Sequence, residues 1–381
     1  MKHILILPSS YSSVFNTMSA PFFRDQALAL QNHGAKVGVL CPLPISLKRV
    51  FVNFFFKFGC DEYNDQGIQT CVYTFPSVPK SFRFNSYVRY VLGKRLLKKY
   101  ILEFGKPDII HVHNFFSGKI AIWAKKKYNI PYVITEHSSA FLTNSLNKSQ
   151  LSLATEVFSK SNYNISVSNG FSDFLSQAFK LNFQTIPNLV DVNFFELSNS
   201  ISKKKKFNFL NIGHLNDNKN QLFLIKQFLK KFGGHSQMIL TVAGSGPNKD
   251  KIIDYLKIFD KYNQVRLFSA PDRKGVLELF QNADCLVVSS KIETFSVVII
   301  EALSCGIPVI SIKSVGPSSI LTDRVGILCD NNDLGESLLK IFENRFSYKK
   351  DVLRNFVVEN YSDKIVSKSL LNVYDKVCDS K

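Results

Sequence analysis

The 381-residue sequence lacks several patterns that would place a protein in a class at once. None of its seven cysteines forms a C-x-x-C pair, and the spacing of cysteine and histidine gives no zinc site. No D-x-D triplet occurs, so the usual carboxylate pair for bridging a metal ion to a diphosphate is absent. The cysteines are odd in number and lie mostly in apolar segments, which favours reduced thiols in a cytoplasmic protein over a disulfide framework.

Long apolar runs are missing as well. No stretch approaches the roughly 18 apolar residues that a membrane-spanning helix needs. The apolar run near the start, Ile4–Leu7, ends at Pro8 and is too short for the core of a signal peptide, so we expect it to be a first strand. Hydrophobic residues nevertheless make up 45% of the chain and aromatic residues 13%, which predicts a globular protein with little disorder.

Acidic residues are scarce in the first half of the chain. The whole sequence has a formal net charge of +18, and residues 1–190 contain 21 Lys and Arg against 9 Asp and Glu. Such an excess is typical of proteins that bind nucleic acid, an acidic substrate or an anionic membrane. No nucleic-acid recognition motif accompanies the charge, so we do not expect nucleic acid as a partner.

Short apolar strands alternate with helical patterns throughout, which predicts an α/β protein with parallel sheets and helices on both faces. A chain of this length usually forms two domains. The first half is expected to contain strands His3–Leu7, Lys36–Cys41, Gln69–Phe75, Asp108–His113, Tyr132–Thr135, Asn164–Ser168 and Phe183–Pro187, with helices Phe22–Asn32 and Ser81–Phe104. The second half is expected to contain strands Phe207–Ile212, Met238–Ala243, Val265–Phe268, Cys285–Ser289, Pro308–Ile312 and Gly326–Cys329.

A polar segment at residues 198–206, SNSISKKKK, separates the two series and predicts a linker. We therefore expect an N-terminal Rossmann-like domain over residues 1–195, a linker over 196–206, a second Rossmann-like domain over 207–360 and a helical tail over 361–381. Open sheets of this kind bind ligands at the carboxyl ends of their strands, so a cleft between the two domains is the expected active site.

The most informative motif is ETFSVVIIE at residues 293–301, where a strand turns into a helix. Glu293 is expected on the loop above the strand's C-terminal edge, and Glu301 in the first turns of a helix over Val298–Ser304 that ends at Gly306. The free amides at such a helix start attract phosphate. Two carboxylates beside an anion site suggest a ligand with hydroxyls at both ends and phosphate between them.

This block resembles the E-x7-E motif of the retaining nucleotide-sugar glycosyltransferases of family 4, the group 1 type with a GT-B fold. The resemblance implies two Rossmann-like domains facing across a cleft, with the last helix crossing back to the N-terminal domain. It implies that Glu293 contacts the donor sugar and is catalytic, and that Glu301 contacts the ribose of the nucleotide. It also implies donor binding by Phe295, Ser296 and Val297, whose amides meet the charge of the leaving group.

Two further segments of the second half resemble donor-site motifs of the family. In LNIGHLNDNKNQ, residues 210–221, Lys219 occupies the place of a lysine that binds the donor diphosphate during catalysis. The arginine that usually follows Gly213 is replaced by His214, whose imidazole lacks the fork and the permanent charge of a guanidinium. Gly244 in AGSGP belongs to a tight turn that lines the nucleotide pocket. The third glycine of a dinucleotide fingerprint is missing there, so nicotinamide binding is not expected.

The first half supplies the other side of the site by the same resemblance. His137 in YVITEHSS matches a histidine that contacts the donor sugar and the reacting phosphate and is assigned to catalysis. His111 and His113, at the end of the preceding strand, are expected to support it, with His113 on the acceptor side. Ser19 and Ala20 stand where the family often has glycines that approach phosphate and acceptor, and Ala permits a less close approach than Gly.

The resemblance thus implies a retaining hexosyltransferase that uses a nucleoside-diphosphate sugar, UDP-linked in preference to GDP-linked, and needs no metal or other cofactor. A nucleotide-sugar 2-epimerase of the same architecture and a non-catalytic sugar-nucleotide-binding protein are the alternatives. A glycosidase that uses the two glutamates is less expected, since its carboxylates must flank the scissile bond roughly 5 to 10 Å apart.

A basic segment over residues 80–99 contains seven cations and no acid, and an aromatic cluster, VFVNFFFKF, precedes it at residues 50–58. A helix with one apolar and one basic face suits the surface of an anionic bilayer, and an ordinary amphipathic core helix has the same pattern. Arg89, Lys94, Arg95 and Lys98 are expected on the basic face. This predicts a cytoplasmic protein, peripheral on the inner membrane, that extends a lipid-linked saccharide of lipopolysaccharide O-antigen or capsule.

Overall fold

The computed structural model describes residues 1–11, 21–46, 58–197 and 206–379. The chain divides into two compact units, the first made of residues 1–189 and 363–381 and the second of residues 190–362. The sequence places the first boundary later, at a linker over 196–206, and most of that segment lies outside the described residues. The return crossing at 362/363 lies two residues beyond the position that the sequence predicts.

An eight-stranded sheet forms the centre of the first unit, in the order β3-β4-β2-β1-β5-β6-β7-β8. Neighbouring strands are parallel except β3 and β4, which form an antiparallel hairpin at the edge. The sequence does not predict β3 because its residues, GCDEYND, are mostly polar, as those of an edge strand often are. The strands are β1 (His3–Leu7), β2 (Lys36–Ser46), β3 (Gly59–Asp65), β4 (Ile68–Ser77), β5 (Ile109–His113), β6 (Tyr132–Glu136), β7 (Tyr163–Ser166) and β8 (Phe183–Thr185).

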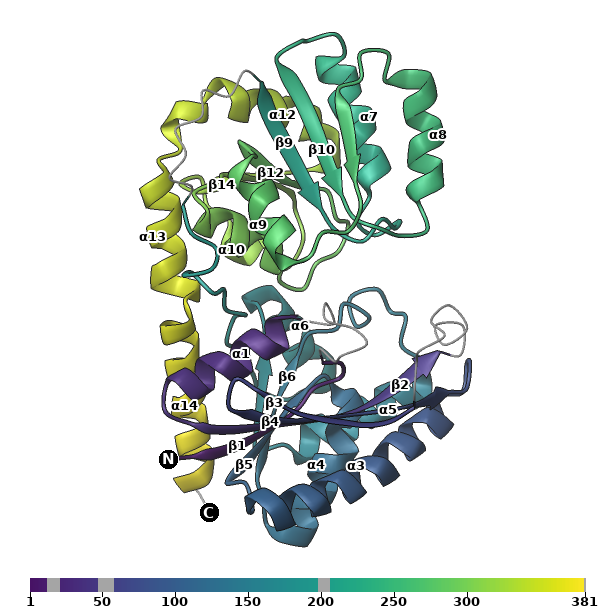
Figure 1. The fold of residues 1–381 in the computed structure, drawn as a ribbon, viewed down its shortest axis with the longest axis vertical. Coiled ribbons are helices and arrows are strands. Elements are labelled where there is room, and N and C mark those ends of the chain that lie inside the picture. The colour runs from purple at the N-terminus through teal and green to yellow at the C-terminus, as the bar shows by residue number, and fades with distance from the viewer. Residues whose placement is uncertain (12–20, 47–57, 198–205, 380–381) are drawn as a thin grey trace. The chain divides into compact units, whose positions relative to one another are not determined.

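Helices cover both faces of this sheet (Figure 1). α1 (Pro21–Asn32) and α14 (Asp363–Asp379) pack together on one face, and α3 (Phe82–Phe104) packs with α4 (Gly118–Tyr128) on the other. Successive side chains of a strand point to opposite faces. Val37 and Val39 of β2 accordingly join the core formed with α1 and α14, whereas Gly38 faces Tyr100 of α3. The remaining elements are η1 (Phe115–Ser117), α5 (Lys148–Lys160) and α6 (Asn169–Phe179).

The second unit contains a six-stranded parallel sheet in the order β11-β10-β9-β12-β13-β14. The sequence predicts every strand of this sheet to within a residue, because each is a short apolar run with a helical pattern behind it. The strands are β9 (Phe207–Ile212), β10 (Met238–Ala243), β11 (Val265–Phe268), β12 (Cys285–Val288), β13 (Val309–Ile312) and β14 (Gly326–Cys329). The helices are α7 (Gln221–Phe232), α8 (Lys249–Phe259), α9 (Arg273–Gln281), α10 (Val297–Ser304), α11 (Pro317–Ile320), α12 (Leu334–Glu343) and α13 (Lys350–Tyr361), with short turns η2 (Asn331–Asp333) and η3 (Arg345–Ser347).

The residues that follow Val190 belong to the second unit because the end of α13 holds them. The Val190 amide donates to the carbonyl of Tyr361 at 3.0 Å, and Val190 forms an isolated parallel bridge with Ser362. The guanidinium of Arg354 donates to the carbonyls of Val192 at 2.8 Å and of Phe195 at 3.0 Å. The boundary is therefore set by main-chain pairing rather than by the polar run that follows.

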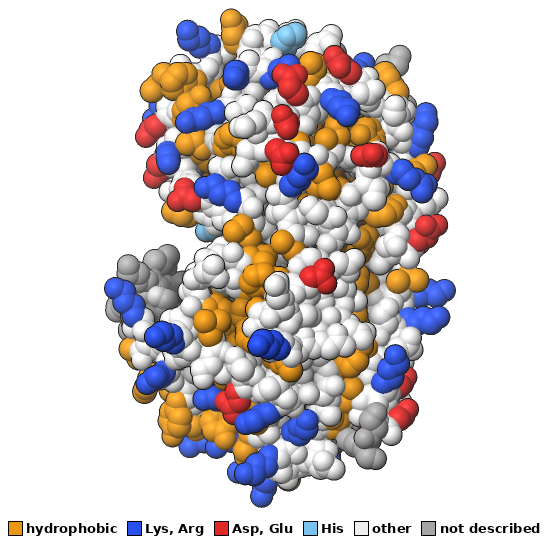
Figure 2. Space-filling model, turned by 180° about the vertical axis from the view of Figure 1, so that it is seen from behind, with side chains coloured by type: hydrophobic (Ala, Val, Ile, Leu, Met, Phe, Trp, Pro, Cys, Tyr) orange, Lys and Arg blue, Asp and Glu red, His pale blue; other side chains and the backbone are white. Residues whose placement is uncertain are grey.

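The basic excess is concentrated in the first unit. That unit contains 25 Lys and Arg against 12 Asp and Glu, and the second contains 23 against 18. On the face drawn in Figure 2, basic side chains predominate over the first unit, whereas both signs are mixed over the second. None of the helices in the described ranges is both long enough and apolar enough to span a bilayer.

Helix α3 is only partly the basic helix that the sequence predicts. Arg95 and Lys98 are exposed as expected, and Lys94 is half-buried, with its ammonium over the rings of Tyr90 and Trp123. Arg89 does not lie on the solvated face, because its side chain is buried at 8% exposure. The prediction for Arg89 was therefore wrong. It shares the buried side of the helix with Gly93, Leu96, Leu97 and Tyr100.

Candidate functional site

The strand order of the second unit reverses between β9 and β12. These strands are parallel neighbours, with Leu210 paired to Leu286, but the chain continues from β9 to β10 on one side and from β12 to β13 on the other. The loops after two such strands diverge, and open α/β sheets bind ligands in the crevice that this leaves. The loops here are residues 213–220 and 289–296, which contain both donor-site motifs.

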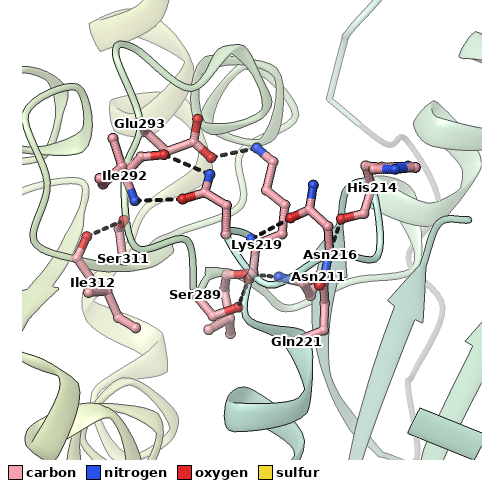
Figure 3. Close-up of polar contacts among 12 residues, drawn as sticks. Asn211, His214, Asn216, Lys219, Gln221, Ser289, Ile292, Glu293, Ser311 and Ile312 are labelled. Atoms are coloured by element: carbon pink, nitrogen blue, oxygen red, sulfur yellow. Dashed lines mark hydrogen bonds and ion pairs between the residues drawn. The ribbon is translucent and has the colours of Figure 1, made fainter. Parts of the chain in front are cut away.

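Hydrogen bonds join these two loops into one platform. Asn218 donates from Nδ2 to the carbonyl of Ile292 at 3.0 Å and accepts at Oδ1 from the Ile292 amide at 3.2 Å. The Ser289 hydroxyl donates to the carbonyl of Lys219 at 2.7 Å (Figure 3). The Lys219 amide in turn donates to Oδ1 of Asn216 at 2.9 Å. The backbone that carries Lys219 is therefore fixed relative to the loop that carries Glu293.

The side chains of Lys219 and Glu293 meet above this platform. Nζ of Lys219 donates to Oε1 of Glu293 at 2.5 Å, and the two side chains keep 30% and 14% of their surface exposed. A cation is disfavoured at the start of a helix, and Lys219 lies just before α7, so the carboxylate compensates an unfavourable position. An anionic ligand that reached Lys219 would take over that role and leave Glu293 available to accept hydrogen bonds from hydroxyl groups.

The start of α10 supplies further groups beside this pair. Ser296 has a positive φ of 84° and directs the chain into the helix, whose first amides, at Val297 and Val298, have no intrahelical acceptor. The side chain of Phe295 is 2% exposed and packs against Tyr361, so only its main chain can face a ligand. The loop is held from the other side by the amide of Gly316, which donates to the carbonyl of Glu293 at 2.9 Å.

Glu301 lies on α10, half-buried, one helical turn beyond those amides. Burial, with the nearby Glu301 carboxylate as the next cause, raises the pKa of the Cys305 thiol to about 12. The two glutamates of the motif are thus placed on the loop and on the helix, as the sequence predicts.

The remaining donor-side residues have different positions. His214 is exposed, and its imidazole points away from Lys219 and Glu293, while its carbonyl accepts from Gln221 at 3.2 Å (Figure 3). Gly244 packs directly against the loop between β9 and α7, because a Cβ at this position would lie 1.9 Å from the Gly213 carbonyl oxygen. The Gly213 amide donates to the carbonyl of Ala243 at 3.0 Å. The AGSGP turn therefore braces the β9–α7 loop, and the structure does not bring His214 to the ion pair.

In the first unit, Glu136 organises the corresponding edge of the sheet. Its buried carboxylate accepts from the amides of Phe115 at 3.1 Å, His137 at 3.0 Å and Ser138 at 2.8 Å. Burial raises the pKa of Glu136 to about 7, and the three amides act against that shift. Asn114, at a positive φ of 63°, also accepts from the His137 amide at 3.1 Å. These bonds fix the loop that carries His137 to the end of β5.

Three histidines lie together on β5 and after β6. Nδ1 of His113 and Nε2 of His137 are 3.0 Å apart, and the rings of His111 and His113 are 4.1 Å apart between centroids. His113 has no exposed surface, so the prediction that it contacts an acceptor is wrong, and it supports His137 instead. Burial lowers the pKa of His137 and of His111 to about 3 and that of His113 well below its usual value. All three are neutral imidazoles near pH 7.

His111 is a structural residue. Its Nδ1 lies 2.6 Å from the hydroxyl of Tyr374 on α14, and its Nε2 lies 2.8 Å from the hydroxyl of Thr135. It therefore joins the returning helix to the middle of the sheet.

Some predicted residues cannot be placed. Ser19, Ala20 and all but the last residue of the aromatic cluster at 50–58 lie outside the described residues. For metals, one group of His, Cys, Asp or Glu in the described part of the chain has ligand atoms within 4.8 Å of one another: Cys60, Glu62 and Cys71. That group is on the β3–β4 hairpin at the edge of the sheet, not on the loops described above.

The residues that sequence reasoning missed are the ones that position others. Asn216, Asn218 and Ser289 hold Lys219 and Glu293, and Glu136 and Asn114 hold His137. The sequence contains a partial signal for these residues. Glu136 directly precedes His137, and Asn216 and Asn218 lie in the turn NDNKN between a strand and a helix.

Comparison with known proteins identifies the class. The family model for "Glycosyltransferase Family 4" matches residues 22–194, and the model for "Glycosyl transferases group 1" matches residues 193–355. Sucrose-phosphate synthase from Thermosynechococcus elongatus has the same fold, with a TM-score of 0.81 over 100% of both chains at 16% identity. Anabaena Alr3699/HepE in complex with UDP has a TM-score of 0.74 over 99% of this chain and 100% of the other at 17% identity.

The matches to two sequence relatives cover only part of each protein. Glycogen synthase of Mycobacterium tuberculosis (strain CDC 1551 / Oshkosh) is 23% identical over 252 residues, 64% of this chain and 61% of that protein. The chain therefore matches less than two thirds of that relative. An uncharacterized 41.2 kDa protein in the cps region of Klebsiella pneumoniae is 23% identical over 296 residues, 72% of this chain and 80% of that protein.

The two sheets, parallel except for the β3–β4 hairpin, and the loops at their carboxyl ends define a GT-B fold of the glycosyltransferase type. The two family models together span residues 22–355, so the chain belongs to the family 4, group 1 glycosyltransferases.

Proposed function

We propose that this protein is a retaining glycosyltransferase that moves a sugar from a nucleoside-diphosphate sugar, with UDP as the nucleotide, to a saccharide acceptor. One observation carries the proposal. The ammonium of Lys219 and the carboxylate of Glu293 meet where the strand order reverses between β9 and β12, beside the start of α10. A diphosphate needs a cation and helix amides, and a sugar needs a hydrogen-bond acceptor, and this edge has all three.

The roles follow from the positions. Lys219 and the amides of Val297 and Val298 bind the diphosphate and take up the charge of the leaving group. Donor binding draws Lys219 to the phosphate, and Glu293 then accepts hydrogen bonds from the sugar hydroxyls. Glu301 binds the ribose. His137, a neutral imidazole, contacts the sugar and the reacting phosphate from the first unit.

Retention is proposed to occur by attack on the face from which the nucleotide departs. The leaving phosphate oxygen takes the proton of the acceptor hydroxyl as the new glycosidic bond forms. This route needs no enzyme nucleophile. Lys219 and the helix amides supply the charge stabilisation, so no metal ion is proposed.

The comparisons support the choice of donor and setting. Anabaena Alr3699/HepE was solved with UDP and with UDP-glucose, which favours a UDP-sugar donor here. The Klebsiella relative is encoded in a cps region, and a lipopolysaccharide outer core galactosyltransferase, WaaB, shares the fold with a TM-score of 0.67. Both favour a role in building a bacterial surface polysaccharide, for which we propose a lipid-linked acceptor in the cytoplasm.

The decisive experiment is incubation of the full chain with UDP-, GDP- and ADP-sugars, after a thermal-shift screen of the same compounds. A ligand at about 100 times its dissociation constant stabilises a fold by about 2.7 kcal/mol, so the donor class will be visible. Sugar transfer to an acceptor is the expected result. Isomerised donor would instead indicate a 2-epimerase, and binding without turnover a non-catalytic protein.

A stripe on α3 supports membrane association. Phe84 and Tyr87 are 50% and 65% exposed, and Arg95 and Lys98 are exposed on the same side of the helix, about two turns beyond Tyr87. Leu102, 87% exposed, continues the stripe. Aromatic side chains and cations on one face suit the headgroup region of an anionic bilayer. We propose that α3 docks the first unit on such a surface.

Liposome flotation tests the docking surface. Binding should require anionic lipid, weaken as salt rises, and fall when Arg95 and Lys98 are changed to Glu. Glu substitutions at Lys249 and Lys251 on α8 of the second unit are the matched control. Binding that depends neither on lipid charge nor on the α3 substitutions would refute the docking face and favour a soluble acceptor.

A further inference from the structure

Arg89 is a cation held inside the first unit, and none of the described residues is its counter-ion. Its side chain is 8% exposed, and Nη1 has neither solvent contact nor a hydrogen-bond partner. Across the described ranges, no residue forms a hydrogen bond or an ion pair with the guanidinium. Burial lowers the pKa of Arg89 to about 10, which leaves the group charged at neutral pH.

Two half-buried arginines in the described part of the chain, Arg24 and Arg354, are compensated. Arg24, in the same unit, donates from Nε and Nη2 to the two carboxylate oxygens of Asp65, both at 2.7 Å. Arg354, in the second unit, donates to the carbonyls of Val192, Phe195 and Ser304 at 2.8 to 3.0 Å. An uncompensated buried charge is costly, and the described residues supply Arg89 with no partner, so a bound ligand is the partner we consider.

The position of Arg89 indicates where that partner binds. Tyr100 of α3 packs against Gly38, near the start of β2. Arg89 lies 11 residues earlier on the helix, roughly 16 Å nearer the carboxyl ends of the strands. Its Cζ lies 5.8 Å from the centroid of the Phe116 ring, in the turn that directly follows β5. Arg89 therefore lies at the edge of the sheet where ligands bind, on the α3 face.

No acidic side chain at this edge is available to Arg89 within the described residues. Glu136, the buried acid there, already accepts three amide hydrogen bonds. The guanidinium presents a planar fork of donors that matches a phosphate or a carboxylate.

We propose that Arg89 binds an oxyanion of the acceptor, a phosphate or a carboxylate, at the carboxyl-end edge of the first unit's sheet. The identification of the ligand as the acceptor rests on the function proposed above, whereas the anion site itself does not. The anion neutralises the charge of Arg89 and places the acceptor at the same edge of the sheet as His137.

The test measures anion binding directly, with inorganic phosphate and acetate as probes. Phosphate will also meet Lys219, so the full chain carries Lys219→Gln throughout. We expect a saturable rise in melting temperature with one or both probes, confirmed by calorimetric titration. Adding Arg89→Gln should weaken that binding about tenfold or more, because a charge-assisted hydrogen-bond pair is lost. Lys127→Gln, an exposed cation on α4 of the same unit, should leave it unchanged.

The outcomes separate the possibilities. Phosphate binding assigns a phosphorylated acceptor, and acetate binding alone a uronic-acid-type acceptor. Lack of a saturable response to either probe with Arg89 intact, or an unchanged response in Arg89→Gln, would overturn the proposal. If Arg89→Gln does not fold, Arg89→Lys serves, with a several-fold loss expected and an unchanged affinity counting against the guanidinium. Failure of sugar transfer with an intact Arg89-dependent anion response would reject the proposed function and keep this site.

Discussion

At the carboxyl-end edge of the second unit's sheet, an ion pair between Lys219 and Glu293 keeps 30% and 14% of its side-chain surface exposed. At the corresponding edge of the first unit, Glu136 and His113 have no exposed surface, and the adjacent imidazole of His137 is neutral. One edge presents an ion pair that a ligand can displace, whereas the other keeps its ionisable side chains, including Glu136 and Arg89, buried.

The difference shows how the same type of sheet serves two partners. A nucleoside diphosphate brings its own charge, so the edge that receives it needs an exposed cation and an acid that holds the cation until then. A sugar hydroxyl brings none, and a neutral imidazole fixed by Glu136 and Asn114 can hydrogen-bond it without competing for the phosphate. Substitutions at either edge of the two sheets test this difference.

The largest effect is expected at Glu293. Glu293→Gln keeps the size of the side chain but weakens its interaction with the sugar hydroxyls and with Lys219, so the transfer rate should fall by about 10² to 10³-fold. Binding of UDP, measured by titration, should change little. Glu336→Gln, in an exposed ion pair with Lys231 of the same unit, is the control. A near-wild-type rate in Glu293→Gln would remove this residue from the site.

Lys219→Ala should mainly weaken donor binding. Loss of one charge-assisted contact to the diphosphate is expected to raise the KM for the donor by about 10 to 100-fold and to lower kcat as well. Steady-state kinetics at several donor concentrations separates the two constants. Lys231→Ala, the partner of Glu336, should leave both unchanged, and equal kinetics for the two alanine variants would contradict the assignment.

Glu136 makes the first unit sensitive to pH in a direction opposite to its histidines. The fold raises the pKa of Glu136 from 4.5 to about 7, so its contribution is complete below pH 4.5 and is lost as the pH rises through 7. The loss is on the order of 3 kcal/mol. The histidines, whose pKa values are lowered, contribute above pH 6.5 and lose that contribution as the pH falls.

The histidines contribute in the same way to wild type and to Glu136→Gln, so the difference in stability between the two proteins reports on Glu136. Urea unfolding of both proteins between pH 4.5 and 8 should show wild type losing stability relative to the variant as the pH rises. Glu156→Gln, an exposed acid on α5 paired with Lys160, should show no such trend. A constant difference between wild type and Glu136→Gln across this range would show that Glu136 does not titrate in it.

The smallest effect is expected at His214. Its imidazole points away from the ion pair, so His214→Arg should change the transfer rate by no more than about fivefold, with a gain above neutral pH if a guanidinium reaches the diphosphate. Rates at pH 6.5 and 8.5 test this. A severe loss at both values would show that His214 has a separate task.

Sequence periodicity was sufficient for the second unit because its strands are short and mostly apolar, and β10, β12 and β13 are buried throughout. The positions of Lys219 and Glu293 in segments that directly follow strands also followed from the sequence, whereas the ion pair between them did not. Asn218 could not be predicted, because its hydrogen bonds depend on the exact course of two loops that are 70 or more residues apart. The polar edge strand β3 likewise becomes visible only through its pairing with β4.

Arg89 shows that a charged residue in the sequence cannot always be assigned to the exposed face of a helix. Seven cations between residues 80 and 99 suggested one solvated face. The helical register does place Arg89 with Gly93, Leu97 and Tyr100, at intervals of 4, 8 and 11 residues, and that register was the available signal. Composition alone assigned the residue to the wrong side of the helix.

The return of the chain at residue 363 has a consequence for synthesis on the ribosome. Val366, Leu370 and Tyr374 of α14 fill the core between α1 and the first sheet, so this core stays incomplete until the last residues of the described chain have emerged. The second unit is continuous from 190 to 362 and can finish first. The apolar face of α1 therefore stays uncovered until α14 has been translated, and the nascent first unit is expected to bind chaperones that recognise exposed apolar segments.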